Sequence, residues 1–178
     1  MIYFIIGASG SGKSACLEPL KNLLPEFTLY DFDDIGVPDN ADKKWRQEAT
    51  EEWIKKLSGS RSNDICLLGQ MVPAEIVSSP SATNLDEIHI ILLDCSDEVR
   101  DQRLRTRNTY GIDQNTLNWA AWLRMHCKDP AWEPHVIKEN TSSRMQFSRW
   151  SHLVDWPNHI KISSVDTSFL TINQTALS

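Results

Sequence analysis

The sequence lacks long hydrophobic runs and an excess of basic residues, and each absence excludes a class of protein. No stretch approaches the roughly 18 consecutive apolar residues that a membrane-spanning helix needs. The net charge of −6 over 178 residues does not suggest a surface for nucleic acid. We therefore expect no membrane partner and no nucleic-acid partner.

Cysteine and histidine are also sparse, and they form no disulfide or metal-binding pattern. The four cysteines (Cys16, Cys66, Cys95 and Cys127) include no C-x-x-C pair, and the five histidines show neither a triad nor metal-ligand spacing. The apolar start of the chain has no positively charged leader and continues directly into a glycine-rich loop, which is not typical of a signal peptide. These features predict a cytoplasmic protein with reduced, partly buried thiols.

Short apolar runs predict strands, and apolar residues at helical spacing lie between them. The predicted strands cover residues 2–6, 27–30, 64–68, 88–93 and 159–162, and the clearest helices cover 15–24 and 42–57. Apolar strands that alternate with helices are typical of a parallel sheet covered on both faces, so we expect a three-layer α/β/α fold. At this length the chain 1–178 is expected to form a single domain. The Ser/Pro/Asn stretch 78–84 is predicted to be a flexible connection.

A long interval between the fourth and fifth predicted strands, about residues 96–158, holds five of the seven tryptophans. A connection of this length is not bare loop in a compact domain, so we expect two or more helices there. We place a helical lid or insertion at about 108–150, part of which closes over the site. Trp119 and Trp122 stand three apart, which favours core packing, with stacking on a nucleobase or sugar as the alternative.

The segment 7–14, GASGSGKS, fits G-x-x-x-x-G-K-[ST] without a mismatch and lies between a predicted strand and a predicted helix. Glycine permits a positive φ and a close approach of the backbone to phosphates, and N–H groups at the start of the helix form an anion cradle. Lys13 can reach the β- and γ-phosphates, and the Ser14 hydroxyl can hold Mg²⁺. The predicted nucleotide-binding loop consists of Gly7, Ala8, Ser9, Gly10, Ser11, Gly12, Lys13 and Ser14, with positive φ expected at the three glycines.

Two acids follow the second predicted strand. If the chain is extended here, the side chains of Asp31 and Asp33 project to the same side. They lie at the carboxyl end of the strand, where open parallel sheets bind ligands. One carboxylate can order the hydration shell of Mg²⁺ and the other can accept a proton from an attacking hydroxyl. The alternative is that Asp33 or Asp34 merely caps a turn or a helix. We predict that Asp31 and Asp33 contact an acceptor, that Asp31 also contacts the metal, and that Gly69 and Gln70 at the end of the third strand complete the acceptor site.

Arginines gather in the helix that follows the fourth strand. Ser96 is a suitable N-cap, and Arg100, Arg103 and Arg107 share one helical face. We expect Arg100 and Arg105 to form solvent-exposed ion pairs with acids of the same helix. Arg103 and Arg107 lie nearer its carboxyl end, where guanidinium groups can stabilise charge on a transferring phosphoryl group. Arg103 is also predicted to contact the nucleotide.

With these residues, the chain resembles the nucleoside- and nucleotide-kinase-like branch of P-loop proteins, which includes adenylate, shikimate and gluconate kinases. The resemblance rests on the loop 7–14, on Asp31-Phe32-Asp33 and on Asp94 followed by Arg103 and Arg107, and it covers the chain to about residue 107 and the last strand. It implies a five-stranded parallel sheet of order 2-3-1-4-5, ATP on the glycine loop and a mobile lid that carries arginines.

The resemblance also implies roles for individual residues of these segments. Lys13 and Ser14 would handle phosphates and metal, Asp33 would meet the acceptor, and Arg103 and Arg107 would act from the lid side of ATP. The segment 118–124 matches no lid of those enzymes. Arg46 and Arg61 are candidate acceptor-binding arginines by location alone.

The favoured function is an ATP-dependent phosphotransferase that uses Mg²⁺ and acts on a small molecule, nucleoside or nucleotide. The alternatives are an NTP hydrolase or switch without a separate acceptor, and a non-catalytic nucleotide-binding protein. A hydrolytic motor commonly ends a core strand in an acid that holds Mg²⁺. The third strand ends in Gly69-Gln70 without such an acid, whereas the fourth ends in Asp94. The acceptor and the oligomeric state are not identified by the sequence.

Overall fold

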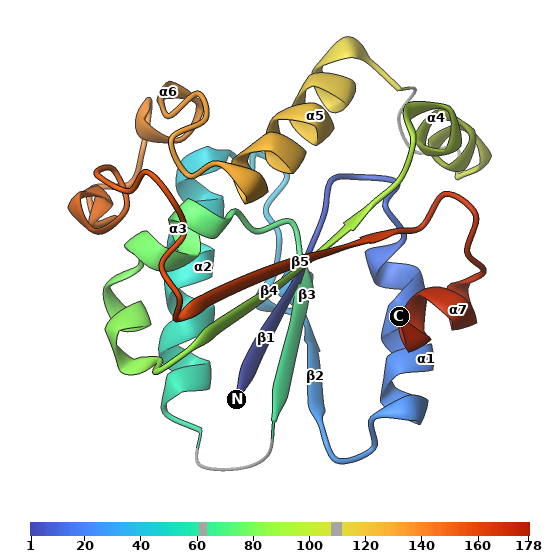
Figure 1. Cartoon of the computed structure of the whole chain (residues 1–178), viewed down its shortest axis with the longest axis horizontal. Coiled ribbons are helices and arrows are strands. Elements are labelled where there is room, and N and C mark those ends of the chain that lie inside the picture. The colour runs from blue at the N-terminus through green and yellow to red at the C-terminus, as the bar shows by residue number, and fades with distance from the viewer. Residues whose placement is uncertain (61–63, 108–111) are drawn as a thin grey trace.

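A computed structural model describes residues 1–60, 64–107 and 112–178 and shows a five-stranded sheet of order β2-β3-β1-β4-β5 (Figure 1). All four strand pairs are parallel. The strands are β1 Ile2–Ile6, β2 Thr28–Asp31, β3 Ile65–Gly69, β4 Ile88–Asp94 and β5 Ile160–Asp166. The predicted strands and their order are confirmed, and β5 continues beyond its predicted end.

Helices lie on both faces of the sheet (Figure 1). The α-helices are α1 Lys13–Leu23, α2 Lys43–Ser58, α3 Pro73–Ser78, α4 Asp97–Thr106, α5 Gln114–Lys128, α6 His135–Lys138 and α7 Ile172–Leu177. Short 3₁₀ helices are η1 Phe32–Ile35, η2 Pro80–Asn84 and η3 Phe147–Arg149. The N-caps of α2 and α4 are the side chains of Asp42 and Ser96, which accept hydrogen bonds from backbone N–H groups inside those helices.

Two separate clusters of buried apolar side chains fill the space between sheet and helices. Along β1, Phe4 and Ile6 point into the larger cluster, with α2, α3 and α5. Ile5 points into the smaller cluster, with α1 and α7. Successive side chains of a strand face opposite sides, so the continuous apolar run of β1 serves both layers.

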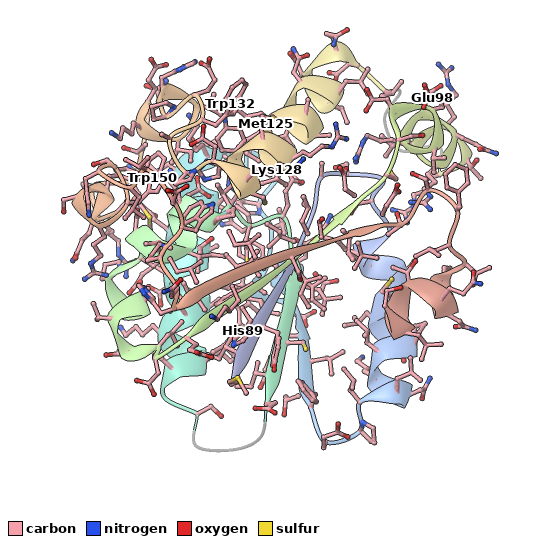
Figure 2. All side chains as sticks on the ribbon, in the orientation of Figure 1. His89, Glu98, Met125, Lys128, Trp132 and Trp150 are labelled. Atoms are coloured by element: carbon pink, nitrogen blue, oxygen red, sulfur yellow. The ribbon has the colours of Figure 1, made fainter. Side chains whose placement is uncertain are left out.

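The long interval before β5 contains α4, α5, α6 and η3, as its length predicts. Trp122 is buried and stacks on Trp119 and on His126, with ring centroids 5.2 and 4.7 Å apart. Trp150, labelled in Figure 2, is also buried and donates a hydrogen bond from Nε1 to the carbonyl of Pro130 at 2.8 Å. The core role predicted for Trp122 is confirmed, whereas Trp119 is half-buried at the edge of the larger cluster.

The stretch 78–84 is not a flexible connection, so that prediction was wrong. Ser78 and Ser79 are fully buried, and η2 begins at Pro80, whose fixed φ suits the first position of a helix. Ser81 donates hydrogen bonds from its backbone N and its Oγ to the Glu51 carboxylate at 3.0 and 2.7 Å. The hydrogen bonds of Ser81 tie this stretch to α2.

The cysteines match the prediction of buried, unpaired thiols. All four are free and buried. Burial raises the pKa of Cys66 and of Cys127 to about 12, which keeps both protonated. In the part of the chain that the structure describes, no helix is both long and apolar enough to cross a membrane.

Candidate phosphate-binding site

The glycine-rich loop connects β1 to α1, as predicted. Gly10 and Gly12 have φ values of 80° and 100°, a left-handed conformation that favours glycine. The positive φ expected at Gly7 is not found. Glycine is required there for space, because a Cβ at Gly7 would lie 2.4 Å from the carbonyl oxygen of Leu93 in β4. The loop therefore packs directly against the neighbouring strand.

Lys13, the first residue of α1, folds back over this loop. Its Nζ donates hydrogen bonds to the carbonyl of Ala8 at 3.1 Å and to Ser11 Oγ at 3.5 Å. Burial, together with the nearby positive charge of Arg100, lowers the pKa of Lys13 to about 8 against the opposing effect of Asp33. An anion bound at the loop would supply the counter-charge that this ammonium group needs.

A cavity of about 260 Å³ lies beside the loop, where the carboxyl ends of β2 and β3 meet the end of α4. It brings together side chains and backbone from four parts of the chain that the sequence singled out. The predicted site residues that line the cavity are Ser9, Gly10, Gly12, Lys13, Ser14, Asp31, Asp33, Gly69, Gln70 and Arg107. Leu68 and Leu104 complete the lining. Four predicted site residues, Gly7, Ala8, Ser11 and Arg103, do not line the cavity.

Asp31 and Asp33 share this cavity, but not for the reason predicted. The chain leaves the extended conformation at Phe32, where η1 begins, so Asp33 is not part of the strand. Asp31 Oδ1 accepts a hydrogen bond from the backbone N of Asp33 at 3.0 Å, and Asp34 Oδ2 accepts one from the backbone N of Asp31 at 3.3 Å. Capping by side chains thus belongs to Asp31 and Asp34, whereas Asp33 takes part through its backbone, whose N–H donates to Asp31 and whose carbonyl accepts from Gly36.

The pKa of the Asp33 carboxylate is raised above its ordinary value, as suits a general base. Partial desolvation and the neighbouring carboxylates of Asp31 and Asp34 raise the pKa of Asp33, while Lys13 opposes this shift. A raised pKa increases the affinity of a carboxylate for a proton, provided that the group is still ionised at neutral pH.

Oxygen atoms that suit Mg²⁺ line the same cavity. They are the hydroxyl of Ser14 and the carboxylates of Asp31 and Asp33. No group of three or more His, Cys, Asp or Glu side chains forms a metal site within the described ranges. Mg²⁺ in phosphate-transferring proteins is usually held by one or two protein groups together with phosphate oxygens and water. The residues present fit a metal that arrives with the nucleotide.

The arginines of α4 and of its C-cap, Arg107, lie on different sides of the loop. Arg107 lines the cavity, whereas Arg103 lies behind the loop, where its Nη1 donates to the carbonyls of Gly10 and Ser11 at 3.2 and 3.4 Å. Arg105 forms the predicted exposed ion pair, with its Nε 2.7 Å from Asp101 Oδ1.

The prediction that Arg100 forms a solvent-exposed ion pair was wrong. The Arg100 side chain is fully buried because this face of α4 packs against the loop. Its Nη1 donates to the carbonyl of Ser9 at 2.5 Å, and its Nη2 donates to Asp94 Oδ1 at 2.8 Å. The helical spacing identified the shared face correctly but could not show that the loop covers it.

Asp94, at the end of β4, is the acid that a hydrolytic motor could use. Its carboxylate accepts hydrogen bonds from Arg100 and from Arg124 of α5, the latter through Nε and also through Nη2 at 3.3 Å. Asp94 lines a different cavity, of about 590 Å³, between α5 and β5. Its partner Arg124 escaped sequence reasoning, because nothing local marks a residue thirty positions away as a partner.

Arg46, one of the two arginines considered for acceptor binding by location, does not line the cavity. Arg46 is paired with Glu75, and Arg61 lies outside the described residues.

Comparisons with known proteins agree with this geometry at the level of the fold. No protein-family model matches the sequence, and no curated protein matches it either. Solved structures match over almost the whole chain at low identity. A tunicamycin resistance protein from Deinococcus radiodurans has a TM-score of 0.59 and 15% identity, and the match covers 99% of this chain and 91% of that one.

A sugar kinase from Janibacter sp. HTCC2649 has a TM-score of 0.55 and 14% identity, with 99% of this chain and 90% of that chain covered. Shikimate kinase from Acinetobacter baumannii, solved with shikimate, has a TM-score of 0.52 and 16% identity, with 99% and 88% covered. The strand order, the glycine loop and these matches together show that the chain has the fold of the P-loop kinases.

Proposed function

We propose that the protein is an ATP-dependent phosphotransferase that transfers the γ-phosphoryl group to a small-molecule acceptor. One observation carries the proposal: a single cavity brings Lys13 and Ser14 of the phosphate loop together with Asp33, which lies in η1 directly after β2. The first two residues suit the phosphates, and the third suits an attacking hydroxyl group. A site that only bound nucleotide would not need a carboxylate in that place.

The chemistry assigns each residue a task. The loop N–H groups and Lys13 hold the phosphates, and Arg107 adds positive charge near the transferred group. Asp33 accepts the proton of the acceptor hydroxyl while the acceptor oxygen bonds to the γ-phosphorus and the bond to the leaving ADP breaks. Gly69 and Gln70 contact the acceptor from the end of β3. Ser14 and Asp31 would hold Mg²⁺, which neutralises phosphate charge when it is bound.

The solved structures with this fold support a small acceptor. Their names include a sugar kinase, a gluconokinase and a shikimate kinase, each with a full-length match to this chain. Each of those names describes a phosphoryl transfer to a small molecule. We propose the same general reaction here, with the acceptor still to be identified.

We also propose that residues 1–178 form one P-loop domain with a helical insertion at about 108–150. Helix α5 of this insertion buries Trp122 and Leu123 in the core shared with the sheet. The hydrolase alternative has no comparable support, because both Arg100 and Arg124 occupy the Asp94 carboxylate.

The test is phosphate transfer from ATP–Mg²⁺ measured with and without a panel of hydroxyl-bearing metabolites. We expect slow turnover of ATP alone and a phosphorylated product with one class of acceptor. The panel should contain neutral sugars and nucleosides, hydroxy acids and nucleoside monophosphates. Fast turnover without any acceptor would instead identify a hydrolase.

A further inference from the structure

Consecutive carbonyl groups of the phosphate loop are held from behind by side chains that lie far away in the sequence. Arg100 donates to the carbonyl of Ser9, and Arg103 donates to the carbonyls of Gly10 and Ser11. The Oγ1 of Thr167, which follows β5, lies 3.0 Å from the Ser11 carbonyl oxygen and accepts a hydrogen bond from Arg103 Nη1 at 2.9 Å. Arg103 Nη2 also donates to the Thr167 carbonyl at 2.7 Å.

The direction of these carbonyls determines the direction of the loop N–H groups. In a planar trans peptide, the C=O of one residue and the N–H of the next point in opposite directions. Holding the carbonyls of Ser9 and Ser11 behind the loop therefore directs the N–H groups of Gly10 and Gly12 to its other side. Gly10 and Gly12 line the cavity there, whereas neither Arg100 nor Arg103 does. The N–H of Ser11 is bonded to the Ala8 carbonyl at 3.2 Å.

A loop of this composition needs such support. Glycine gives Gly10 and Gly12 access to many backbone conformations, so the free loop would lose entropy on binding phosphate. Arg100 is fully buried, and its charge is balanced by Asp94, whose backbone carbonyl also lies 2.9 Å from Thr167 Oγ1. The network thus joins β4, α4 and the segment after β5 to the back of the loop.

We propose that Arg100 and Arg103 are positioning residues that preorganise the phosphate-binding N–H groups, rather than groups that contact the nucleotide. The proposal rests on the nucleotide binding in the proposed function. It changes the role expected for Arg103, from stabilising the transferring phosphoryl group to shaping the loop that receives it.

Two ligands distinguish these roles. Binding of Mg²⁺–ATP and of inorganic tripolyphosphate is measured by calorimetry for the wild-type chain, Arg103→Lys and Arg100→Lys. Lysine keeps the positive charge but cannot reproduce the fork of N–H donors. In each variant we expect the affinity for both ligands to fall by the same factor, about tenfold to a hundredfold. Arg105→Lys, an exposed change on the same helix, should bind both ligands normally.

Two outcomes overturn the proposal. If Arg103→Lys weakens ATP but not tripolyphosphate, then Arg103 contacts the base or sugar. If neither arginine variant weakens tripolyphosphate, then the loop does not depend on them. Because a lysine buried in place of Arg100 can prevent folding, Thr167→Val and Thr167→Ser form a second pair. The serine variant, which keeps the hydroxyl, should bind tripolyphosphate about tenfold more tightly than the valine variant, and equal binding would also count against the network.

A measurement without ligand separates this proposal from the proposed function. Amide hydrogen exchange of residues 7–14 is compared in the wild-type chain, Arg103→Lys and Arg105→Lys. Faster exchange in Arg103→Lys, with normal exchange in Arg105→Lys, supports the network. This holds even if the wild-type chain binds no ATP, because a failure to bind ATP refutes only the proposed function. Unchanged exchange in Arg103→Lys overturns the positioning role.

Discussion

The guanidinium of Arg46 forms a two-pronged ion pair with the carboxylate of Glu75, with Nε 2.9 Å from Oε2 and Nη2 2.7 Å from Oε1. Glu75 is fully buried and also accepts a hydrogen bond from Gln47 Nε2 at 3.0 Å. The Arg46 guanidinium lies 4.9 Å from the centre of the Trp119 ring. An arginine that was a candidate for acceptor binding therefore links α2 to α3 and α5.

Replacing Glu75 with alanine should lower the free energy of unfolding by about 3 kcal/mol, because Arg46 would lose its buried counter-charge. Urea denaturation measures this change. Glu52→Ala is the matched control, because Glu52 pairs with Arg144 on the surface and its loss should cost under about 1 kcal/mol. Equal effects of the two changes would show that the buried pair is not important for stability.

Lys13→Ala should abolish nucleotide-dependent phosphate transfer and leave the fold intact. Among the described residues, the Lys13 side chain bonds to groups of its own loop, so its removal costs the core little, whereas the phosphates lose their nearest cation. Transfer assays and thermal unfolding check the two parts of this prediction. Retained transfer in a folded variant would show that the loop has been misinterpreted.

ATP binding should weaken as the pH rises above about 8. The pKa of Lys13 is lowered from 10.5 to about 8, so the unliganded side chain loses its proton there, whereas bound phosphates favour the charged form. Binding at about pH 8.5 should therefore take up protons, which calorimetry in two buffers of different ionisation enthalpy detects.

The same lowered pKa has the opposite effect on folding. The unfolded chain binds more protons than the folded chain between about pH 8 and pH 10.5, so Lys13 makes stability rise with pH in that window.

Proton uptake on ATP binding should disappear in Lys13→Ala and persist in Lys21→Ala, whose lysine pairs with Glu18 on the surface. Uptake that survives in Lys13→Ala would assign the titration to another group.

Asp33→Asn should reduce the rate of transfer by about a hundredfold or more while changing ATP affinity little, because an amide cannot accept the acceptor proton. Asp34→Asn is the control, since Asp34 accepts a hydrogen bond from the backbone of Asp31 and does not line the cavity. Steady-state rates and ATP binding are measured for both variants. An unchanged rate in Asp33→Asn would reduce Asp33 to a structural role at the start of η1.

Local patterns were enough to find the phosphate loop and the strands. A strand, a glycine loop and a helix are contiguous in residues 2–24, so their order and spacing can be read without knowing the rest of the molecule. The strand order was an expectation taken from resemblance, and the structure confirms it. Asp31 and Asp33 share one cavity although the chain is not extended through both, because Asp31 ends β2 and Asp33 lies in η1 directly after it.

Only the tertiary structure decided what the arginines do. Arg100 and Arg103 meet loop carbonyls 91 to 93 positions away, and Asp94 meets Arg124 thirty positions away. No periodicity links such residues, because their contact depends on how α4 and α5 pack against the ends of the strands. A charged helical face is solvated unless another segment covers it. Here the phosphate loop covers that face, which changes an expected surface ion pair into buried support for the loop.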